Sequence, residues 1–209
     1  MAGQIRTFVP VFGVMSPAPL SARPRDAILE HAMDLASVDG LQGLTIGALA
    51  ARIEMSKSAL FARFGSKEEL QLATVDSARR VLEREVIAPA ADRRAGLGRV
   101  RALTEGYLDY LRAEVFAGGC LLSAAVLEFD GRPGPVRDAI AVASRSWSAA
   151  LEGAIADGLA GGEIARDADA AQIAFEINAL LNQANAGYQM TGDRQVFERA
   201  RHGIARTLE

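Results

Sequence analysis

The sequence predicts an all-α fold in which a small unit of three short helices precedes a larger helical bundle. From residue 24 onward, apolar residues recur every three or four positions, which is the spacing of one face of an α-helix. Alanine is plentiful and aromatic residues make up only 6% of the 209 residues, a composition that favours packed helices. No stretch alternates apolar and polar residues clearly enough to predict a strand.

The first three expected helices are short and follow one another closely. The first covers about 24–38 and is broken by glycines. Thr45 is a good N-cap for a second helix at about 46–53, and Ser56 is the N-cap of a third, which Gly65 ends. A unit of this size buries too little apolar surface to be stable alone, so we expect the next helix to support it.

The later helices are longer. Ser66 and Glu69 form a capping box for a helix that we expect to stop near Pro89. Asp169 and Gln172 form another capping box further along. The other helices are expected at about 97–113, in a short segment ending near 129, and at about 135–159, 169–188 and 194–208.

Composition indicates in which cellular compartment the protein is expected. A single cysteine, Cys120, rules out a disulfide framework within the chain and favours a cytoplasmic protein. No apolar run approaches the ~18 residues that span a bilayer, so no membrane partner is expected. Residues 1–22 carry apolar residues interrupted by proline and glycine, which favours a flexible arm over a signal peptide. Met15 is an alternative start.

Basic residues are concentrated in one stretch of an otherwise acidic chain. The net charge is −3, yet residues 52–67 carry Arg52, Lys57, Arg63 and Lys67 against the single acid Glu54. The two short helices joined at Glu54 have the spacing of a helix-turn-helix unit. In such a unit the second helix enters the major groove of DNA.

The helix that follows Ser56 has a suitable size and surface for that groove. Its eight or nine residues span about 13 Å at ~1.5 Å per residue, close to the groove width. Leu60 and Phe64 share one face and are expected in the core, which leaves small, polar and basic residues for DNA. The expected DNA-binding residues are Thr45, Ser56, Lys57, Ser58, Ala59, Phe61, Ala62, Arg63 and Lys67, with Lys67 on a phosphate.

The run TIGALAARIEMSKSALFARFGSKEEL resembles the DNA-binding signature of the TetR family of bacterial transcriptional regulators. The resemblance covers roughly residues 25–72, and GGCLLSAAVLEFDGRPGPVRDAI is similar to a ligand-domain segment of some members. It implies an all-helical homodimer that binds a palindromic operator in double-stranded DNA. It also implies a helix-turn-helix domain at 23–70 and a ligand-binding and dimerisation domain at 71–209.

Four positions depart from the family pattern. Glu54 stands where the turn usually has glycine, and a left-handed backbone there costs ~1–2 kcal/mol. Phe61 replaces a tyrosine, Arg63 replaces a histidine and Gly65 replaces a proline. The individual DNA contacts are therefore expected to differ from those of relatives.

The C-terminal part is expected to hold an apolar or amphipathic small-molecule effector between its helices. The candidate pocket residues are Tyr107, Phe116, Leu121, Leu127, Trp147, Phe175 and Asn178. The last two helices resemble the pair that forms the dimer interface in the family, with Ala174, Leu181 and Ile204 as candidate contacts. Each of these residues has plain core packing as its alternative.

The sequence offers no set of residues for catalysis, and we expect neither an enzyme nor a cofactor or metal. Cys120 has only His31 and His202 as distant candidate bases, and a small buried residue is the simpler interpretation, with a redox-sensing thiol as the alternative. Glu128 and Asp130 beside a Gly/Pro loop are expected at a solvated helix end rather than in a metal or acid/base site.

The expected function is a ligand-responsive transcriptional regulator, a repressor that a small molecule releases from its operator. The alternative is a helical small-molecule-binding or carrier protein without DNA-binding activity. The sequence leaves the effector, the operator, the regulated genes and the sign of regulation open.

Overall fold

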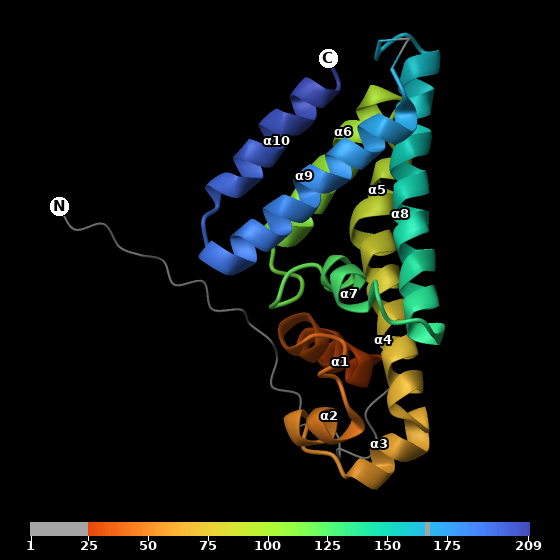
Figure 1. The fold of residues 1–209 in the computed structure, drawn as a ribbon, viewed down its shortest axis with the longest axis vertical. Coiled ribbons are helices and arrows are strands. Elements are labelled where there is room, and N and C mark those ends of the chain that lie inside the picture. Colours follow the sequence, from red (N-terminus) through yellow and green to blue (C-terminus); the bar gives the residue numbers. More distant parts are fainter. Residues whose placement is uncertain (1–24, 166–167) are drawn as a thin grey trace, which may run out of the picture.

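The structure is a computed structural model that describes residues 25–165 and 168–209. The expected arm at 1–22 lies outside these residues. Within the described ranges the regular elements are all helices, as the periodicity predicts. They form an elongated molecule with the three short helices at one end of its long axis (Figure 1).

The three-helix unit consists of α1 (Arg25–Asp39), α2 (Ile46–Arg52) and α3 (Lys57–Phe64). Both expected N-caps are confirmed: the Thr45 hydroxyl accepts from the backbone N–H of Ala48, and the Ser56 hydroxyl accepts from that of Ala59. Leu60 and Phe64 are buried, at 0% and 5% exposure, so the core side of α3 is as expected.

The next helix ends close to the predicted position but contains a π-helical turn. The Ser66 cap begins α4 (Lys67–Leu82), which continues through a π-helical turn, η2 (Glu83–Ile87), into α5 (Ala88–Ala91). The helical path thus ends two residues beyond Pro89, and the prediction that it stops near Pro89 is confirmed. Proline lacks an N–H and its ring crowds the carbonyl four residues earlier, and the wider π turn before it gives that ring room.

The C-terminal bundle contains five helices. These are α6 (Leu97–Arg112), α7 (Leu121–Phe129), α8 (Pro135–Ala160), α9 (Ala170–Thr191) and α10 (Gln195–Thr207). α8 runs beside α4 along the long axis, and α9 packs against both α8 and α10 (Figure 1). Within the bundle, the short α7 lies nearest to the three-helix unit (Figure 1).

One hydrophobic core extends through both parts, from Ile28 in α1 to Ile204 in α10. The three short helices are therefore supported by the bundle, as their small size requires. None of the described helices is long and apolar enough to cross a membrane.

Candidate nucleic-acid interface and ligand pocket

The turn between α2 and α3 keeps its shape without a glycine. Glu54 adopts a left-handed backbone with φ of 56°, which costs a non-glycine residue ~1–2 kcal/mol. The backbone N–H of Met55 then donates to the carbonyl of Ala50 at 3.0 Å, and the buried Met55 side chain anchors the turn. The rest of the unit holds this strained residue in place.

The side of α3 that faces away from the core is exposed. Lys57, Ser58 and Ala62 are exposed there, and Phe61 is 58% exposed although it is aromatic. A shallow hollow on this face is lined by Ile46, Gly47, Lys57, Ser58, Phe61 and Ala62. This surface has the small, basic and apolar groups that reading a major groove requires.

Three other expected DNA-binding side chains have partners inside the protein. The Thr45 and Ser56 hydroxyls cap α2 and α3, as described above; the start of α3 is exposed, whereas that of α2 is half-buried. Lys67 donates from Nζ to the carbonyl oxygen of Gln42 at 2.6 Å. Because the ammonium group has three N–H donors, this contact is compatible with a phosphate, and the phosphate contact of Lys67 stays a prediction. Ala59 and Arg63 are half-buried.

The loop from 40 to 44 joins α1 to α2 and is held from two sides. On one side, the Glu128 carboxylate at the end of α7 accepts from the backbone N–H groups of Leu41 at 2.8 Å and of Gln42 at 2.7 Å. On the other side, Lys67 holds the Gln42 carbonyl, and the buried Gln71 amide donates to the Leu41 carbonyl at 2.6 Å. We call this arrangement the Glu128 clamp.

The solvated helix end expected for Glu128 was therefore wrong. Its carboxylate pairs with two orphan N–H groups that lie 86 and 87 residues away in the sequence, a contact that no local pattern reveals. The same region has a second tie, because the N–H of Gly118 donates to the Ser37 hydroxyl of α1 at 3.0 Å. The segment around α7 is thus fastened directly to the three-helix unit.

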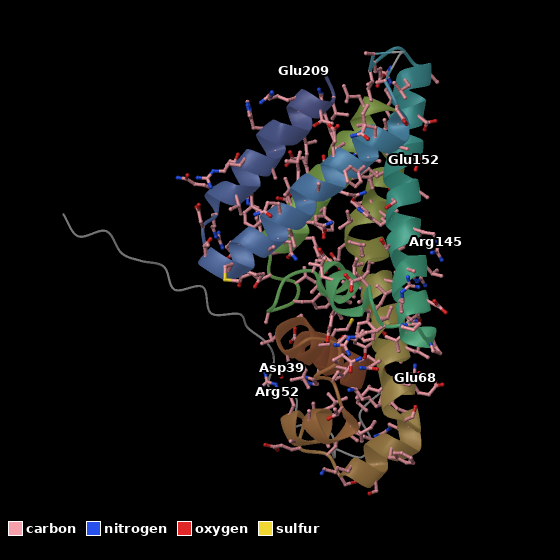
Figure 2. The ribbon with its side chains drawn as sticks, viewed as in Figure 1. Asp39, Arg52, Glu68, Arg145, Glu152 and Glu209 are labelled. Atoms are coloured by element: carbon pink, nitrogen blue, oxygen red, sulfur yellow. The ribbon has the colours of Figure 1, made fainter. Side chains whose placement is uncertain are left out.

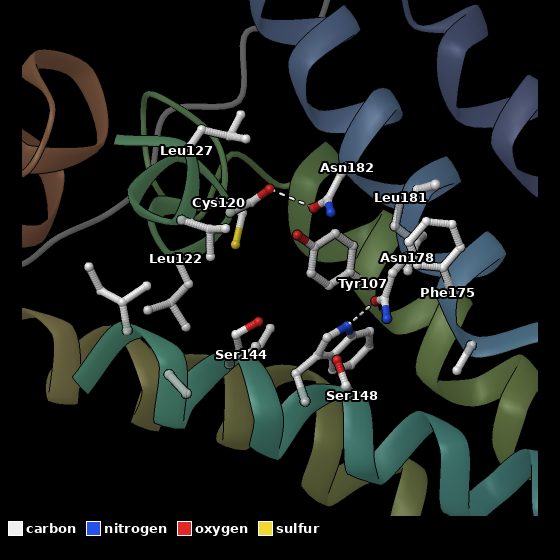
Figure 3. A pocket seen from close by; sticks show the side chains of 18 of the residues that line it. Tyr107, Cys120, Leu122, Leu127, Ser144, Ser148, Phe175, Asn178, Leu181 and Asn182 are labelled. Carbon is white, nitrogen blue, oxygen red and sulfur yellow. Dashed lines mark hydrogen bonds between the residues drawn. The ribbon is translucent and has the colours of Figure 1, made fainter. Parts of the chain in front are cut away.

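A cavity of about 640 Å³ lies between α7, α8 and α9 (Figure 3). Its wall includes five of the expected residues: Tyr107, Leu127, Trp147, Phe175 and Asn178. Sequence reasoning missed other members, among them Cys120, Ser123, Ser144, Ser148 and Glu152. The spacing of Ser144 and Ser148 around Trp147 on one helix was a usable signal.

Two expected pocket residues were wrong. Phe116 is 5% exposed and packs edge-on against Tyr110, with ring centroids 6.1 Å apart, outside the cavity wall. Leu121 is buried at the start of α7 and is likewise absent from the wall. Both side chains complete the core behind the pocket, which is their plain packing alternative.

Polar side chains in the wall are paired with one another. The indole N–H of Trp147 donates to Asn178 Oδ1 at 2.6 Å, and the hydroxyl of Ser123 lies 2.6 Å from Asn182 Oδ1 (Figure 3). Behind them, Asn185 accepts from the backbone N–H of Cys120 at 3.0 Å, which ties α9 to the start of α7.

A buried phenol adds a donor to the wall. Tyr107 is 4% exposed, and its ring lies 5.3 Å from that of Trp147. Burial, together with the nearby Cys120 thiol, raises the pKa of Tyr107 well above its ordinary value, so the hydroxyl remains protonated. Burial and Cys120 raise the pKa of Tyr110 in the same way. The thiol of Cys120 is buried, as expected.

The residues expected at a dimer interface are inside the protomer. Ala174, Leu181 and Ile204 are 4%, 1% and 4% exposed, so they have almost no surface for a second copy. Ala174 and Leu181 contribute instead to the pocket wall. Periodicity identified an apolar stripe on each helix, but that stripe packs within the bundle.

The described residues show no constellation typical of catalysis. Residues 25–165 and 168–209 contain no group of three or more His, Cys, Asp or Glu placed to hold a metal ion. His31 in α1 and His202 in α10 are exposed, and Cys120 is buried. The described structure combines the exposed face of α3 at one end with a cavity near its middle.

Comparison with known proteins gives two family matches. Residues 96–204 match the family described as "Tetracyclin repressor-like, C-terminal domain". Residues 28–74 match "Bacterial regulatory proteins, tetR family". A search of curated proteins finds no match.

Solved structures with the same fold are regulators of this type. A TetR transcriptional regulator from Chloroflexus aurantiacus J-10-FL is 24% identical with a TM-score of 0.78, over 87% of this chain and 92% of that one. A TetR-family regulator from Streptomyces coelicolor is 23% identical with a TM-score of 0.76, over 91% and 89%. AibR, solved in complex with isovaleryl coenzyme A and operator DNA, is 20% identical with a TM-score of 0.72, over 88% and 97%.

The two family matches follow the order of the structure. The N-terminal match covers α2, α3 and most of α1, and the C-terminal match covers the bundle that encloses the pocket. The longer match alone spans more than half of the chain. The protein therefore belongs to the TetR family of bacterial transcriptional regulators.

Proposed function

We propose that this regulator is a repressor that binds a palindromic operator as a homodimer and is released from it by a small molecule in the pocket. The observation that carries this proposal is the position of α7. Leu127, in the pocket wall, directly precedes Glu128, which holds the loop between α1 and α2. A ligand that displaces α7 therefore also displaces the loop between α1 and α2. We call the three-helix unit α1–α3, which contains this loop, the reading unit.

Helix α3 reads the DNA in this proposal. Lys57 and Ser58 lie near its start, where a recognition helix meets base edges, and Phe61 and Ala62 supply apolar surface for thymine methyl groups. The helix starts after Thr45 and Ser56 offer backbone N–H groups to phosphates. Lys67 acts indirectly, by fixing the loop that carries Gln42.

A second copy supplies the other reading helix, because one short helix covers only one half-site. We place the dimer contact on the outer faces of α9 and α10. A hollow there is lined by Phe175, Glu176, Ala179, Leu180, Gly203, Arg206 and Thr207. Substituting Ala179 by arginine is expected to give monomers in light scattering, whereas Val142→Arg, at an exposed apolar position of α8 away from this face, serves as the control. A dimeric Ala179→Arg protein would contradict this placement.

Release works through a change in the relative positions of the two reading helices. Half-sites lie ~34–36 Å apart on DNA, so a rotation of each reading unit breaks the fit. The ligand shifts the equilibrium only by its difference in affinity for the two arrangements. We propose that the Glu128 clamp is the contact that differs between them, and that the protein acts in the cytoplasm without catalysis.

The test of this function uses DNA from upstream of the gene. A labelled fragment is titrated with protein at two salt concentrations and with an unrelated fragment as competitor. We expect a salt-sensitive, sequence-selective complex, because phosphate contacts release counterions and base contacts add selectivity. Binding that is absent or indifferent to sequence, for fragments covering the neighbouring promoters, would favour a carrier protein without DNA-binding activity.

A further inference from the structure

The pocket wall points to a particular chemical class of effector, an inference that rests on the proposed function because it concerns the same site. We propose that the pocket takes a neutral aromatic or alicyclic molecule whose carbonyl oxygen accepts a hydrogen bond from the side-chain amide of Asn178. The proposal excludes coenzyme A thioesters and free carboxylates as effectors, although the structurally similar AibR was solved with a coenzyme A thioester.

The first argument is charge. Among the described residues that line the cavity, none is lysine, arginine or histidine, and the charged side chain in the wall is the acid Glu152. Arg145 lies on the same helix (Figure 2) but is exposed and outside the wall. Moving a carboxylate or phosphate out of water is offset best by a charged partner, because hydrogen bonds from neutral donors, such as the hydroxyls of this wall, compensate less. An anion therefore finds no counterion here and meets Glu152 instead.

The second argument is the orientation of the Asn178 amide. The indole of Trp147 has only a donor, so the atom that it contacts at 2.6 Å must be the amide oxygen of Asn178. The assignment of oxygen and nitrogen, which is ambiguous for many amides, is fixed at this residue. The Asn178 nitrogen, with two N–H donors, is the group left for a ligand in the cavity.

The third argument is the shape and polarity of the remaining wall. The rings of Tyr107 and Trp147 lie next to each other, and the largely exposed Phe175 contributes a third ring (Figure 3). Tyr107, Ser144 and Ser148 add hydroxyl groups, while most of the other lining residues are apolar. Such a wall packs well against a flat apolar ligand and can donate hydrogen bonds to a few acceptor atoms on it.

The fourth argument is size. A cavity of about 640 Å³ lies in the middle of the ~300–1,000 Å³ range of sites for drug-sized ligands. A single ring system with short substituents fits that volume. The nucleotide part of a coenzyme A thioester would have to remain outside this volume, where the described wall offers its phosphates no basic group to contact.

The test exploits Trp147, which is the only tryptophan of the chain. Quenching of its fluorescence reports pocket occupancy directly and requires no DNA. The probes share one skeleton: methyl 2-naphthoate, 2-acetylnaphthalene, 2-naphthoate, 2-ethylnaphthalene and 2-naphthylmethylammonium, with isovaleryl coenzyme A as a further probe. We expect the neutral ester and ketone to bind most tightly, the hydrocarbon roughly three- to tenfold more weakly, and the two anions not at all.

Two variants isolate the role of Asn178. Asn178→Asp keeps the volume and the acceptor for Trp147 but removes the amide donors, and Asn178→Leu removes both. We expect either change to abolish the preference for ketone over hydrocarbon while the hydrocarbon still binds. Gln183→Leu, an exposed amide on the same helix outside the wall, is the matched control and should keep the preference.

Several results would overturn the proposal. These are equal or tighter binding of 2-naphthoate or isovaleryl coenzyme A, tightest binding of the ammonium probe, an unchanged ketone preference in Asn178→Asp, or no quenching by either carbonyl probe. Failure of the repressor function has a different signature. In that case the carbonyl probes quench Trp147 in the expected order, but the operator complex is unaffected by them.

Discussion

Replacing Glu128 by glutamine tests the link between pocket and reading unit with a minimal change in shape. The carboxylate accepts two backbone hydrogen bonds, from Leu41 at 2.8 Å and from Gln42 at 2.7 Å. Glutamine has one acceptor oxygen, and its NH₂ group would face the second N–H, donor against donor. One charge-assisted bond is lost and the remaining bond becomes neutral.

The magnitude follows from the value of such bonds. A hydrogen bond to a charged group contributes ~1.5–3 kcal/mol, so the clamp weakens by about that amount. Each 1.36 kcal/mol is tenfold in an equilibrium, which gives a roughly 10- to 100-fold rise in local opening of the loop. The core of the reading unit is untouched, so global unfolding should change less than this loop.

Hydrogen–deuterium exchange followed by mass spectrometry measures the effect directly, on peptides that cover residues 38–46. We expect Glu128→Gln to exchange the Leu41 and Gln42 amides about 10- to 100-fold faster than wild type. Asp130→Asn is the matched control, because the Asp130 carboxylate contacts only the adjacent Gly131 N–H in the described structure. In a functional assay the Glu128→Gln variant should still bind effector, but the effector should lower its operator affinity less than it lowers that of the wild type. Unchanged exchange at these amides, or an undiminished effector response, would refute the role of the clamp.

The remaining predictions concern the reading unit. Lys57→Ala is expected to weaken operator binding and to lower the salt slope by about one if Lys57 contacts a phosphate; an unchanged slope assigns it to base edges or solvent. Lys67→Ala should lower the melting temperature and weaken binding without changing the slope, because its ammonium group holds the Gln42 carbonyl; a slope that falls by one would restore the phosphate role. Glu54→Gly is expected to stabilise the protein by up to ~1 kcal/mol in chemical unfolding, since it relieves a left-handed backbone, and a loss of stability would contradict this.

Local patterns in the sequence were sufficient for the reading unit. Thr45, Ser56 and Ser66 cap their helices as expected, because a capping hydroxyl bonds an N–H only three residues ahead. Leu60 and Phe64 are core residues, since their spacing puts them on one helical face. The fold class follows from the same short-range periodicity.

Contacts between distant segments could not be read in this way. Glu128 looked like a solvated residue because its partners are more than eighty residues away. Ala174, Leu181 and Ile204 are buried in the protomer, because the resemblance that placed a dimer interface on the last two helices does not identify which face of each helix is outside. The bond from Lys67 to the Gln42 carbonyl could not be predicted either, because a backbone carbonyl carries no sequence signal.

The pocket could be predicted from the sequence in part. Trp147 and Asn178 were both expected in its wall, yet the hydrogen bond between them, which fixes the amide, joins residues 31 positions apart. Phe116 was included as an aromatic residue of the same region, but it packs against Tyr110 behind the wall. Residue type indicated a cavity lining, and only the packing of α7, α8 and α9 decided which side chains reach it.

The most direct test of the account is fluorescence anisotropy of the labelled upstream DNA, titrated first with protein and then with a carbonyl ligand that quenches Trp147. We predict a sequence-selective complex that dissociates as the pocket fills, with the same midpoint in anisotropy and in tryptophan quenching. A complex that stays intact while Trp147 is fully quenched would contradict the claim that this pocket controls the reading helices.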